Sequence, residues 1–195
     1  MRTDGSFALR YGGFSPEIAS DAFIAPSAQL IGNVRIGSQS SIWYGCILRG
    51  DVNHIYVGNR SNLQDGTIVH VTPDTAPVRI GSDVLVGHAA LIHGCELQDG
   101  SFVGMRATVL NNAVVETGAL IAAGALVTEG TLVKSNEMWA GVPARKLGLV
   151  PPALADTMRA AVRHYVQLAK NHAAAIEAQS NGATDISDSR GGESP

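Results

Sequence analysis

Three of the six histidines of this 195-residue chain lie in one stretch, from Leu63 to Cys95. They are His70, His88 and His93. Three imidazoles plus one open position form the ligand set of a catalytic zinc site. The histidines can act together only if the fold brings them together, so the periodicity of the surrounding chain is the next evidence to consider.

A six-residue repeat of aliphatic side chains runs from Ile18 to Val133. Nineteen such hexads occur, with irregular steps after Leu48, Val69 and Ile92. The spacing fits neither a helix nor the two-residue alternation of a half-buried strand. It is typical of a solenoid in which each hexad forms a short strand and a bend, with the aliphatic side chain in the bore. Three hexads close one triangular coil, so we expect about six coils.

The repeat predicts where the histidines lie. His70 and His93 each directly follow the aliphatic residue of a hexad, and three hexads separate them. The two are therefore expected at the same corner of adjacent coils, about 4.8 Å apart. His88 is predicted one face away, so it reaches their metal only from a neighbouring chain. Triangular prisms pack naturally as a cyclic trimer, which would place a three-histidine site at each of three interfaces.

Four features together resemble the gamma-class carbonic anhydrases and their close relatives. They are the hexads, RGD at residues 49–51, NLQDGTIVH at 62–70 and GHAALIHGC at 87–95. The resemblance covers about residues 10–175. It implies a left-handed parallel β-helix that forms a homotrimer, with zinc (iron or cobalt in some settings) between subunits. The activity that it implies is the reversible hydration of CO2 to bicarbonate.

The resemblance also implies a metal-ligand set. His70 and His93 match the two ligands from one chain, and His88 matches the ligand from the next. Arg49 and Asp51 match an ion pair between subunits. A second interpretation of Arg49 is direct binding of bicarbonate, because a guanidinium group can bind two oxygens at once.

Four further residues match polar positions around the reacting water. Asn62, Gln64 and Asp65 match residues beside the metal-bound water, and Tyr165 matches a helix position that faces the active site. Gln64 is suited to accept the proton of a hydroxide nucleophile, and Asp65 to hold Gln64 or Arg49 in place. The alternatives are a simple corner turn for residues 64–66 and a packed aromatic ring for Tyr165.

The chain departs from the best-studied branch of this family at two places. Val52 stands where that branch has glutamate, and the loop after His70 is the short VTPDTAP, whose single acid is Asp74. The chain thus resembles a shorter branch, in which hydratase activity ranges from clear to undetectable. The alternative functions are thioester hydrolysis at the same metal, acyl transfer from CoA with one histidine as the base, and a catalytically silent, metal-stabilised scaffold.

The composition of the chain argues against some classes of binding partner. The net charge is −3, the isoelectric point is near 6.0, and no cluster of Lys and Arg occurs, which argues against a nucleic-acid partner. Neither an apolar run of about 18 residues nor a signal-peptide pattern is present, so we expect no membrane association and a cytoplasmic protein. Cys46 and Cys95 are expected to be small buried thiols.

The sequence predicts three parts. Residues 1–148 form the solenoid with an N-terminal cap, residues 149–178 form a helix, and residues 179–195, which are rich in Ser, Gly and Asp, form a disordered tail. The helix is expected to pack on the flank of the prism through an apolar stripe of Leu154, Met158, Val162, Tyr165 and Leu168.

Overall fold

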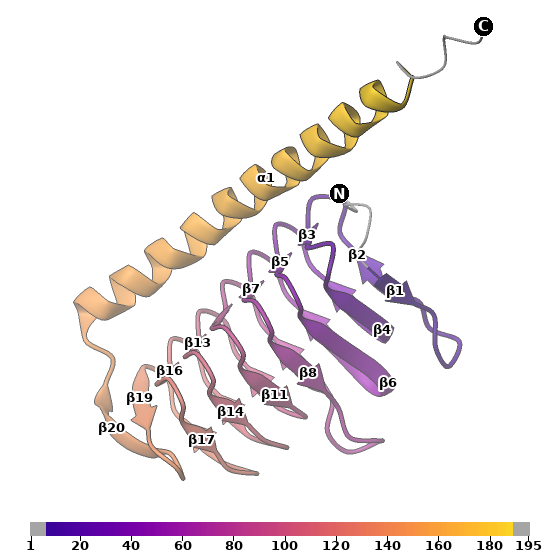
Figure 1. The fold of residues 1–195 in the computed structure, drawn as a ribbon. Coiled ribbons are helices and arrows are strands. Elements are labelled where there is room, and N and C mark those ends of the chain that lie inside the picture. Colours follow the sequence, from indigo (N-terminus) through magenta and orange to yellow (C-terminus); the bar gives the residue numbers. More distant parts are fainter. Residues whose placement is uncertain (1–6, 189–195) are drawn as a thin grey trace, which may run out of the picture.

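The computed structural model describes residues 7–188 of the chain. Its strands wind into a parallel solenoid of about seven turns, which is followed by one helix (Figure 1). The solenoid that the hexads predict and the C-terminal helix that the apolar stripe predicts are thus confirmed.

The turns build three walls. The first wall contains β1 (Phe7–Leu9), the first part of β4 (Gln29–Ile36), the first part of β6 (Ile47–Val57), β8 (Ile68–His70), β11 (Leu91–His93), β14 (Thr108–Val109) and β17 (Leu126–Val127). The second wall contains β2 (Glu17–Ile18), the second parts of β4 and β6, β9 (Val78–Ile80), β12 (Glu96–Leu97), β15 (Val114–Val115) and β18 (Leu132–Val133). The third wall contains β3 (Phe23–Ile24), β5 (Ser41–Ile42), β7 (Asn62–Leu63), β10 (Leu85–Val86), β13 (Phe102–Val103), β16 (Leu120–Ile121) and β19 (Glu137–Ala140), and β20 (Arg145–Leu149) pairs with β19 antiparallel.

Two rungs outside the counted hexads explain why there are about seven turns and not six. Strand β1 precedes the first hexad and pairs in parallel with β4, with Ala8 opposite Leu30. Strand β19 follows the last hexad and pairs in parallel with β16, with Trp139 opposite Ile121. Strand β1 departs from the six-residue spacing, whereas β19 keeps it with the aromatic Trp139, six residues after Val133. A search for aliphatic residues at that spacing therefore detects neither strand.

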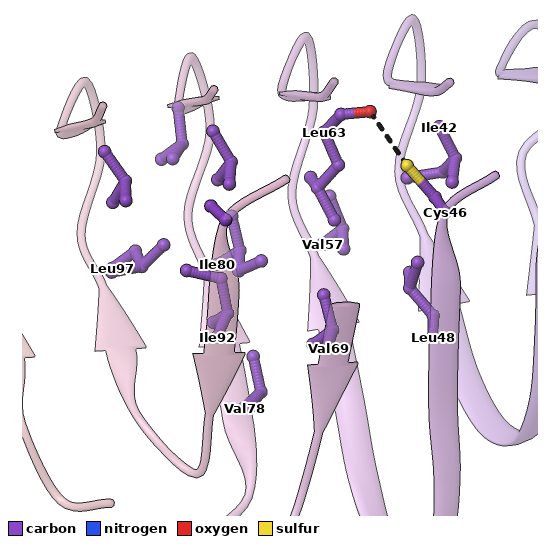
Figure 2. Close-up of a cluster of buried hydrophobic side chains, with 14 of the residues drawn as sticks. Ile42, Cys46, Leu48, Val57, Leu63, Val69, Val78, Ile80, Ile92 and Leu97 are labelled. Carbon is purple, nitrogen blue, oxygen red and sulfur yellow. Dashed lines mark hydrogen bonds between the residues drawn. The ribbon is translucent and has the colours of Figure 1, made fainter. Parts of the chain in front are cut away.

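The hexad aliphatics fill the bore of the solenoid (Figure 2). Leu63, Val69 and Ile92 have no exposed surface. Removing each such side chain from water contributes roughly 1.5–3 kcal/mol. Cys46 and Cys95 are also buried, and burial raises the pKa of each thiol to about 12. Both cysteines are therefore packing residues, as expected.

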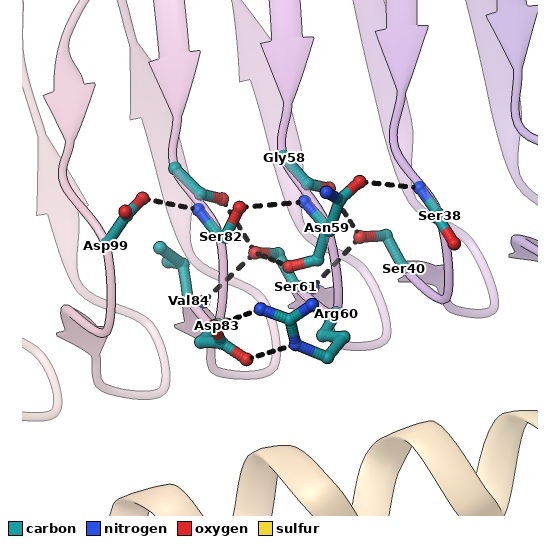
Figure 3. A network of polar contacts seen from close by, with 11 residues as sticks. Ser38, Ser40, Gly58, Asn59, Arg60, Ser61, Ser82, Asp83, Val84 and Asp99 are labelled. Carbon is teal, nitrogen blue, oxygen red and sulfur yellow. Dashed lines mark hydrogen bonds and ion pairs between the residues drawn. The ribbon is translucent and has the colours of Figure 1, made fainter.

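Side chains at the corner between the second and third walls tie adjacent turns together (Figure 3). The Ser38 N–H donates to Asn59 Oδ1 at 2.9 Å, the Asn59 N–H to Ser82 Oγ at 3.1 Å, and the Ser82 N–H to Asp99 Oδ1 at 2.7 Å. These hydrogen bonds satisfy backbone N–H groups that have no strand partner at the bend. They therefore fix the register of successive turns.

The first two irregular steps both lie at the corner between the first and second walls. The register of pairing between β4 and β6 shifts between Gly32 and Val34. As a result, residues 51–54 of β6 lie opposite the single residue Asn33 of β4. Residues 71–77 form a short excursion between β8 and β9, closed by the bridge between Thr72 and Ala76. This corner therefore carries extra chain on two adjacent turns, and we call it the insertion corner.

Helix α1 (Pro152–Asp188) runs back along the solenoid toward its N-terminal turns (Figure 1). It contacts β3, β5, β7 and β10 of the third wall, and Met158 and Val162 are buried against the solenoid. The helix continues to Asp188, whereas the sequence predicts its end at 178. Residues 179–188 contain no proline, and adding a residue to an existing helix costs little. The rest of the predicted tail, residues 189–195, lies outside the described residues. No helix in the described part of the chain is long and apolar enough to cross a membrane.

Candidate metal site

His70 and His93 lie directly opposite each other on β8 and β11. His70 Nδ1 is 3.1 Å from His93 Nε2, and the ring centroids are 5.1 Å apart. The count of hexads predicts this stacking at one corner. Two ligand nitrogens on one tetrahedral zinc ion, each about 2.0–2.1 Å from it, stand roughly 3.3 Å apart. The separation of the two nitrogens is therefore close to what a shared ion requires.

The outward nitrogen of each ring contacts an oxygen. His70 Nε2 is 3.1 Å from Asp51 Oδ1, and His93 Nδ1 is 2.6 Å from Asn111 Oδ1. The Asn111 amide nitrogen donates to Thr72 Oγ1 at 3.0 Å, which directs the amide oxygen toward His93. An oxygen acceptor holds the N–H of a neutral imidazole on its own side.

These contacts leave lone pairs on the two nitrogens that face each other. Two lone pairs at 3.1 Å repel each other unless a proton or a metal ion lies between them. A divalent metal that accepts both lone pairs removes this repulsion, and the oxygen partners fix the tautomers that such binding needs. The residues present at the insertion corner therefore fit a metal ion.

Burial favours the metal-binding, neutral form of His70 beside Asp51. Asp51 Oδ2 is 2.5 Å from Arg49 Nη1 within the same chain, whereas the resemblance implies a pair between subunits. Burial alone would raise the pKa of Asp51, but hydrogen bonds from Arg49 and His70 together lower it. Burial, the largest influence on His70, lowers the pKa of this ring despite the bond to Asp51. The neutral imidazole that a metal requires is thus favoured.

His88 lies at a different corner, between the third and first walls. Its Nδ1 is 2.9 Å from Asp65 Oδ2, and both side chains are 44% exposed. In the part of the chain that the structure describes, no three His, Cys, Asp or Glu side chains converge as a metal-ligand group. One chain thus supplies a histidine pair at the insertion corner and a single histidine at the second corner, which we call the His88 corner.

Asp65 contacts His88, and not Gln64 or Arg49 as the sequence suggested. A carboxylate on one ring nitrogen of a histidine orients the other nitrogen outward, an arrangement common in metal sites. The positions of the two residues in the solenoid explain why Asp65 pairs with His88. Asp65 and His88 occupy the same corner position on adjacent turns, where the Ala89 N–H donates to the Asp65 carbonyl oxygen at 2.8 Å.

Asn62, Gln64 and Tyr165 also belong to the His88 corner. The Gln64 amide nitrogen approaches Asn62 Oδ1 at 3.4 Å, and both side chains are buried. The Tyr165 ring packs edge-on against Trp43, with centroids 5.4 Å apart. Burial, with a smaller contribution from the Asp65 charge, raises the pKa of Tyr165. The structure thus divides the predicted site residues between two corners: Arg49, Asp51, His70 and His93 at one, and Asn62, Gln64, Asp65, His88 and Tyr165 at the other.

Sequence reasoning missed Asn111 and Thr72. Asn111 lies one turn beyond His93 but one residue outside its column: Ile92 pairs with Val109, so Leu110 follows His70 and His93 and Asn111 stands opposite Gly94. Extending the column by one turn gives the apolar Leu110, so the count of hexads alone does not detect Asn111. Thr72 carried no signal either, because it stands in an irregular loop where the six-residue repeat gives no position.

Comparisons with known proteins add to this geometry. No family model matches the chain. The chain is 47% identical over 164 residues to "Gamma carbonic anhydrase 2, mitochondrial" of Arabidopsis thaliana, covering 82% of the chain and 59% of that protein. It is 46% identical over 92 residues to "Probable carbonic anhydrase" of Methanocaldococcus jannaschii, which covers 47% of the chain and 57% of that protein. The chain therefore spans less than two thirds of the length of these relatives.

A solved structure resembles nearly the whole fold. A hexapeptide transferase family protein from Anaplasma phagocytophilum is 42% identical and superposes with a TM-score of 0.82. The match covers 88% of the chain and 99% of that protein. The similarity thus includes the corners that carry the candidate residues.

Proposed function

The chain belongs to the gamma carbonic anhydrase-like family of hexapeptide-repeat proteins, and we propose that it hydrates CO2 reversibly to bicarbonate at a metal ion shared between subunits of a homotrimer. The observation that carries the proposal is the pair of facing nitrogens of His70 and His93, each ring fixed by an oxygen on its far side. Zinc is the proposed metal, and iron(II) and cobalt suit the same nitrogen donors.

The division of residues between two corners supports the shared site. His70 and His93 would supply two ligands from one subunit, and His88 of the neighbouring subunit the third. His88 is exposed and its ring is already oriented by Asp65, as a ligand directed toward another chain should be. The trimer is the assembly in which every insertion corner meets one His88 corner.

When bound, the metal ion supplies a Lewis acid that acidifies a coordinated water. Gln64 orients the attacking water, because its amide nitrogen is directed to Asn62 and its amide oxygen is left to accept the proton. Asp65 orients His88, and Asp51 holds the Nε2 side of His70, while burial favours the neutral form of that ring. Arg49 is half exposed and held by Asp51, where its guanidinium can bind the bicarbonate product. Tyr165 on α1 closes the His88 corner and excludes water from one side.

The predicted cytoplasmic location, and the absence of nucleic-acid and membrane partners, remain predictions. The related Arabidopsis protein is named as mitochondrial. The catalytically silent scaffold remains the main alternative, because Val52 and the short loop after His70 lack the acidic groups of the best-studied branch. Activity measurements on metal-loaded protein distinguish the two.

The test is complementation between two inactive variants. His88→Ala removes the ligand at one corner, and His93→Ala removes a ligand at the other. Each homotrimer should bind metal poorly and show no hydration by stopped flow. In a trimer assembled from an equal mixture, a site is intact where a His88→Ala chain, which keeps His70 and His93, lies next to a His93→Ala chain, which supplies His88. About a quarter of the sites meet this condition, so about a quarter of wild-type activity should return.

Two results would count against the proposal. Wild-type protein with full zinc or anaerobic iron but no CO2 hydration would leave only a scaffold or another hydrolytic activity. Activity that does not return in demonstrably mixed trimers, while the wild type is active, would place His88 outside the shared site.

A further inference from the structure

Asn111 connects His93 to the loop that follows His70. On one side its amide oxygen lies 2.6 Å from His93 Nδ1, and on the other its amide nitrogen donates to Thr72 Oγ1 at 3.0 Å. Thr72 belongs to residues 71–77, the excursion between β8 and β9, which we call the Thr72 loop. The Asn111 side chain thus connects His93, the candidate ligand on β11, to the loop that begins next to His70, the other candidate ligand.

Thr72 is itself firmly held. Its N–H donates to the Ala76 carbonyl oxygen at 3.0 Å, and its carbonyl oxygen accepts from Asn53 Nδ2 at 3.0 Å. Asn53 lies in the irregular part of β6, on the preceding turn. The two insertions therefore brace each other, and they hold the Thr72 hydroxyl at a fixed place beside Asn111.

The backbone next to His93 is shaped to admit Asn111. Gly94 has φ +56°, and a side chain at this position would meet the amide oxygen of Asn111 and, at 2.7 Å, the Cβ of Ala76. A residue other than glycine would push Asn111 or the Thr72 loop away from His93. Close packing from both sides indicates that the contact between Asn111 and His93 is a built feature of this corner.

An asparagine amide has two chemically different ends, and only one of them suits metal binding here. With the oxygen toward His93, Nδ1 keeps the proton and Nε2 presents its lone pair to the metal. With the amide reversed, Nδ1 would accept, Nε2 would carry the proton, and the metal-binding atom would be blocked. In the structure the amide has the first orientation, with its nitrogen donating to the Thr72 hydroxyl and its oxygen toward His93.

We propose that Asn111 and Thr72 are positioning residues that fix the tautomer and ring plane of His93. The short loop after His70 thereby acts as a brace for a ligand on the next turn. This inference rests on the proposed metal site, but it concerns ligand preparation and not the hydration step. Partners of metal-binding histidines typically contribute about 10–100-fold to metal affinity.

The test uses the full-length protein and two readouts. The first is zinc affinity by competition with a chromophoric chelator, and the second is the His93 tautomer by ¹⁵N NMR of the metal-free protein. Thr72→Val keeps the shape of the side chain but removes the hydroxyl, and Thr72→Ser restores it. Thr128→Val is the matched control, because the Thr128 hydroxyl is exposed and its hydrogen-bond partner is Thr131.

We expect Thr72→Val to weaken zinc binding by about tenfold and to raise the fraction of His93 protonated on Nε2. Thr72→Ser and Thr128→Val should behave as wild type. Asn111→Asp, which keeps an oxygen toward His93, should keep the Nδ1–H tautomer, while Asn111→Ala should lose it and bind zinc about 10–100-fold more weakly. Circular dichroism melts identify any variant that fails to fold, and Thr72→Val is the mildest of the set.

Wild-type affinity together with a wild-type tautomer in Thr72→Val would overturn the inference. An Nε2–H tautomer in the wild-type metal-free protein would overturn it as well. Zinc binding with the expected tautomer shifts but no CO2 hydration would refute the proposed activity and leave the positioning role standing. The tautomer readout needs neither metal nor turnover, so the two failures are distinguishable.

Discussion

His70 Nδ1 and His93 Nε2 face each other at 3.1 Å, while the opposite nitrogen of each ring contacts an oxygen, of Asp51 for His70 and of Asn111 for His93. The two rings are thus oriented by partners from two other turns before any metal arrives. Pre-oriented ligands lose little conformational freedom on binding, so the affinity of the site depends on these outer contacts as well as on the histidines.

Replacing His93 by alanine should lower zinc affinity by more than about 100-fold, because a direct ligand is lost and not merely its oxygen partner. Zinc per chain is measured by plasma mass spectrometry after dialysis against a buffered low concentration of free zinc. Wild type should hold about one ion per chain, as three imidazoles and an open position allow. His54→Ala serves as the control, because His54 lies in the irregular part of β6 outside the proposed ligand set. Equal zinc retention by His93→Ala and wild type would rule out the site.

The fold was predictable because one physical requirement repeats along the chain. Every hexad must place an aliphatic side chain in the bore, so Leu63, Val69 and Ile92 show the same spacing that their complete burial explains. Strand β1 was missed because it pairs without following that spacing, and strand β19 because an aromatic residue, Trp139, stands at the expected position. The helix end was placed too early because polar composition does not by itself end a helix that has already formed.

The candidate site was predictable only where position in the repeat determines position in space. His70 and His93 occupy one column, so their proximity followed from counting residues. Asp65 and His88 also share one position on adjacent turns, but which side-chain atoms pair depends on side-chain directions, and the bond of Asn111 to Thr72 depends on a loop outside the repeat. The contact of Asn111 with Thr72 joins residues 39 positions apart in the sequence, and no periodicity specifies it.

Replacing Leu63 by alanine should destabilise the solenoid by about 2–5 kcal/mol, since the side chain is completely buried and the neighbouring turns cannot easily close the cavity. Urea unfolding followed by circular dichroism measures the loss as a lower midpoint with an unchanged slope. Leu132→Ala is the matched control, because Leu132 is 48% exposed on the outer surface. Similar midpoints for the two variants would contradict the assignment of the hexad aliphatics to the bore.

Glu137 should make the stability of the last turn depend on pH. Its carboxylate accepts hydrogen bonds from Lys146 at 2.6 Å and Trp139 at 2.9 Å, and these bonds, in that order, lower its pKa. A lowered pKa means that the folded state binds the proton more weakly than the unfolded state. The stabilisation is therefore complete above the ordinary pKa near 4.5 and is lost as the pH falls through the lower, folded value.

The Glu137→Gln variant tests this dependence, because the amide keeps the shape of the side chain and removes the charge. Urea midpoints of wild type and variant are compared at pH 7 and at pH 3.5. Wild type should be the more stable at pH 7, and the difference should shrink at pH 3.5. A difference that stays constant with pH would show that the Glu137 charge does not stabilise this end of the solenoid.

Gln64 provides the sharpest separation of chemistry from metal binding. Its side chain is 5% exposed and its amide nitrogen is directed to Asn62, so Gln64→Leu keeps the approximate volume and loses the amide oxygen that would orient the attacking water. We expect kcat for CO2 hydration to fall roughly 10–1,000-fold, as it does when a fixed polar partner of a reacting group is removed. Zinc content should stay at the wild-type level, because Gln64 lies at the His88 corner without contacting a ligand histidine. Asn62→Asp, which keeps an oxygen toward the Gln64 amide nitrogen, should retain most of the activity. Loss of zinc in Gln64→Leu would make Gln64 a structural support of the site, whereas full activity would remove it from the reaction.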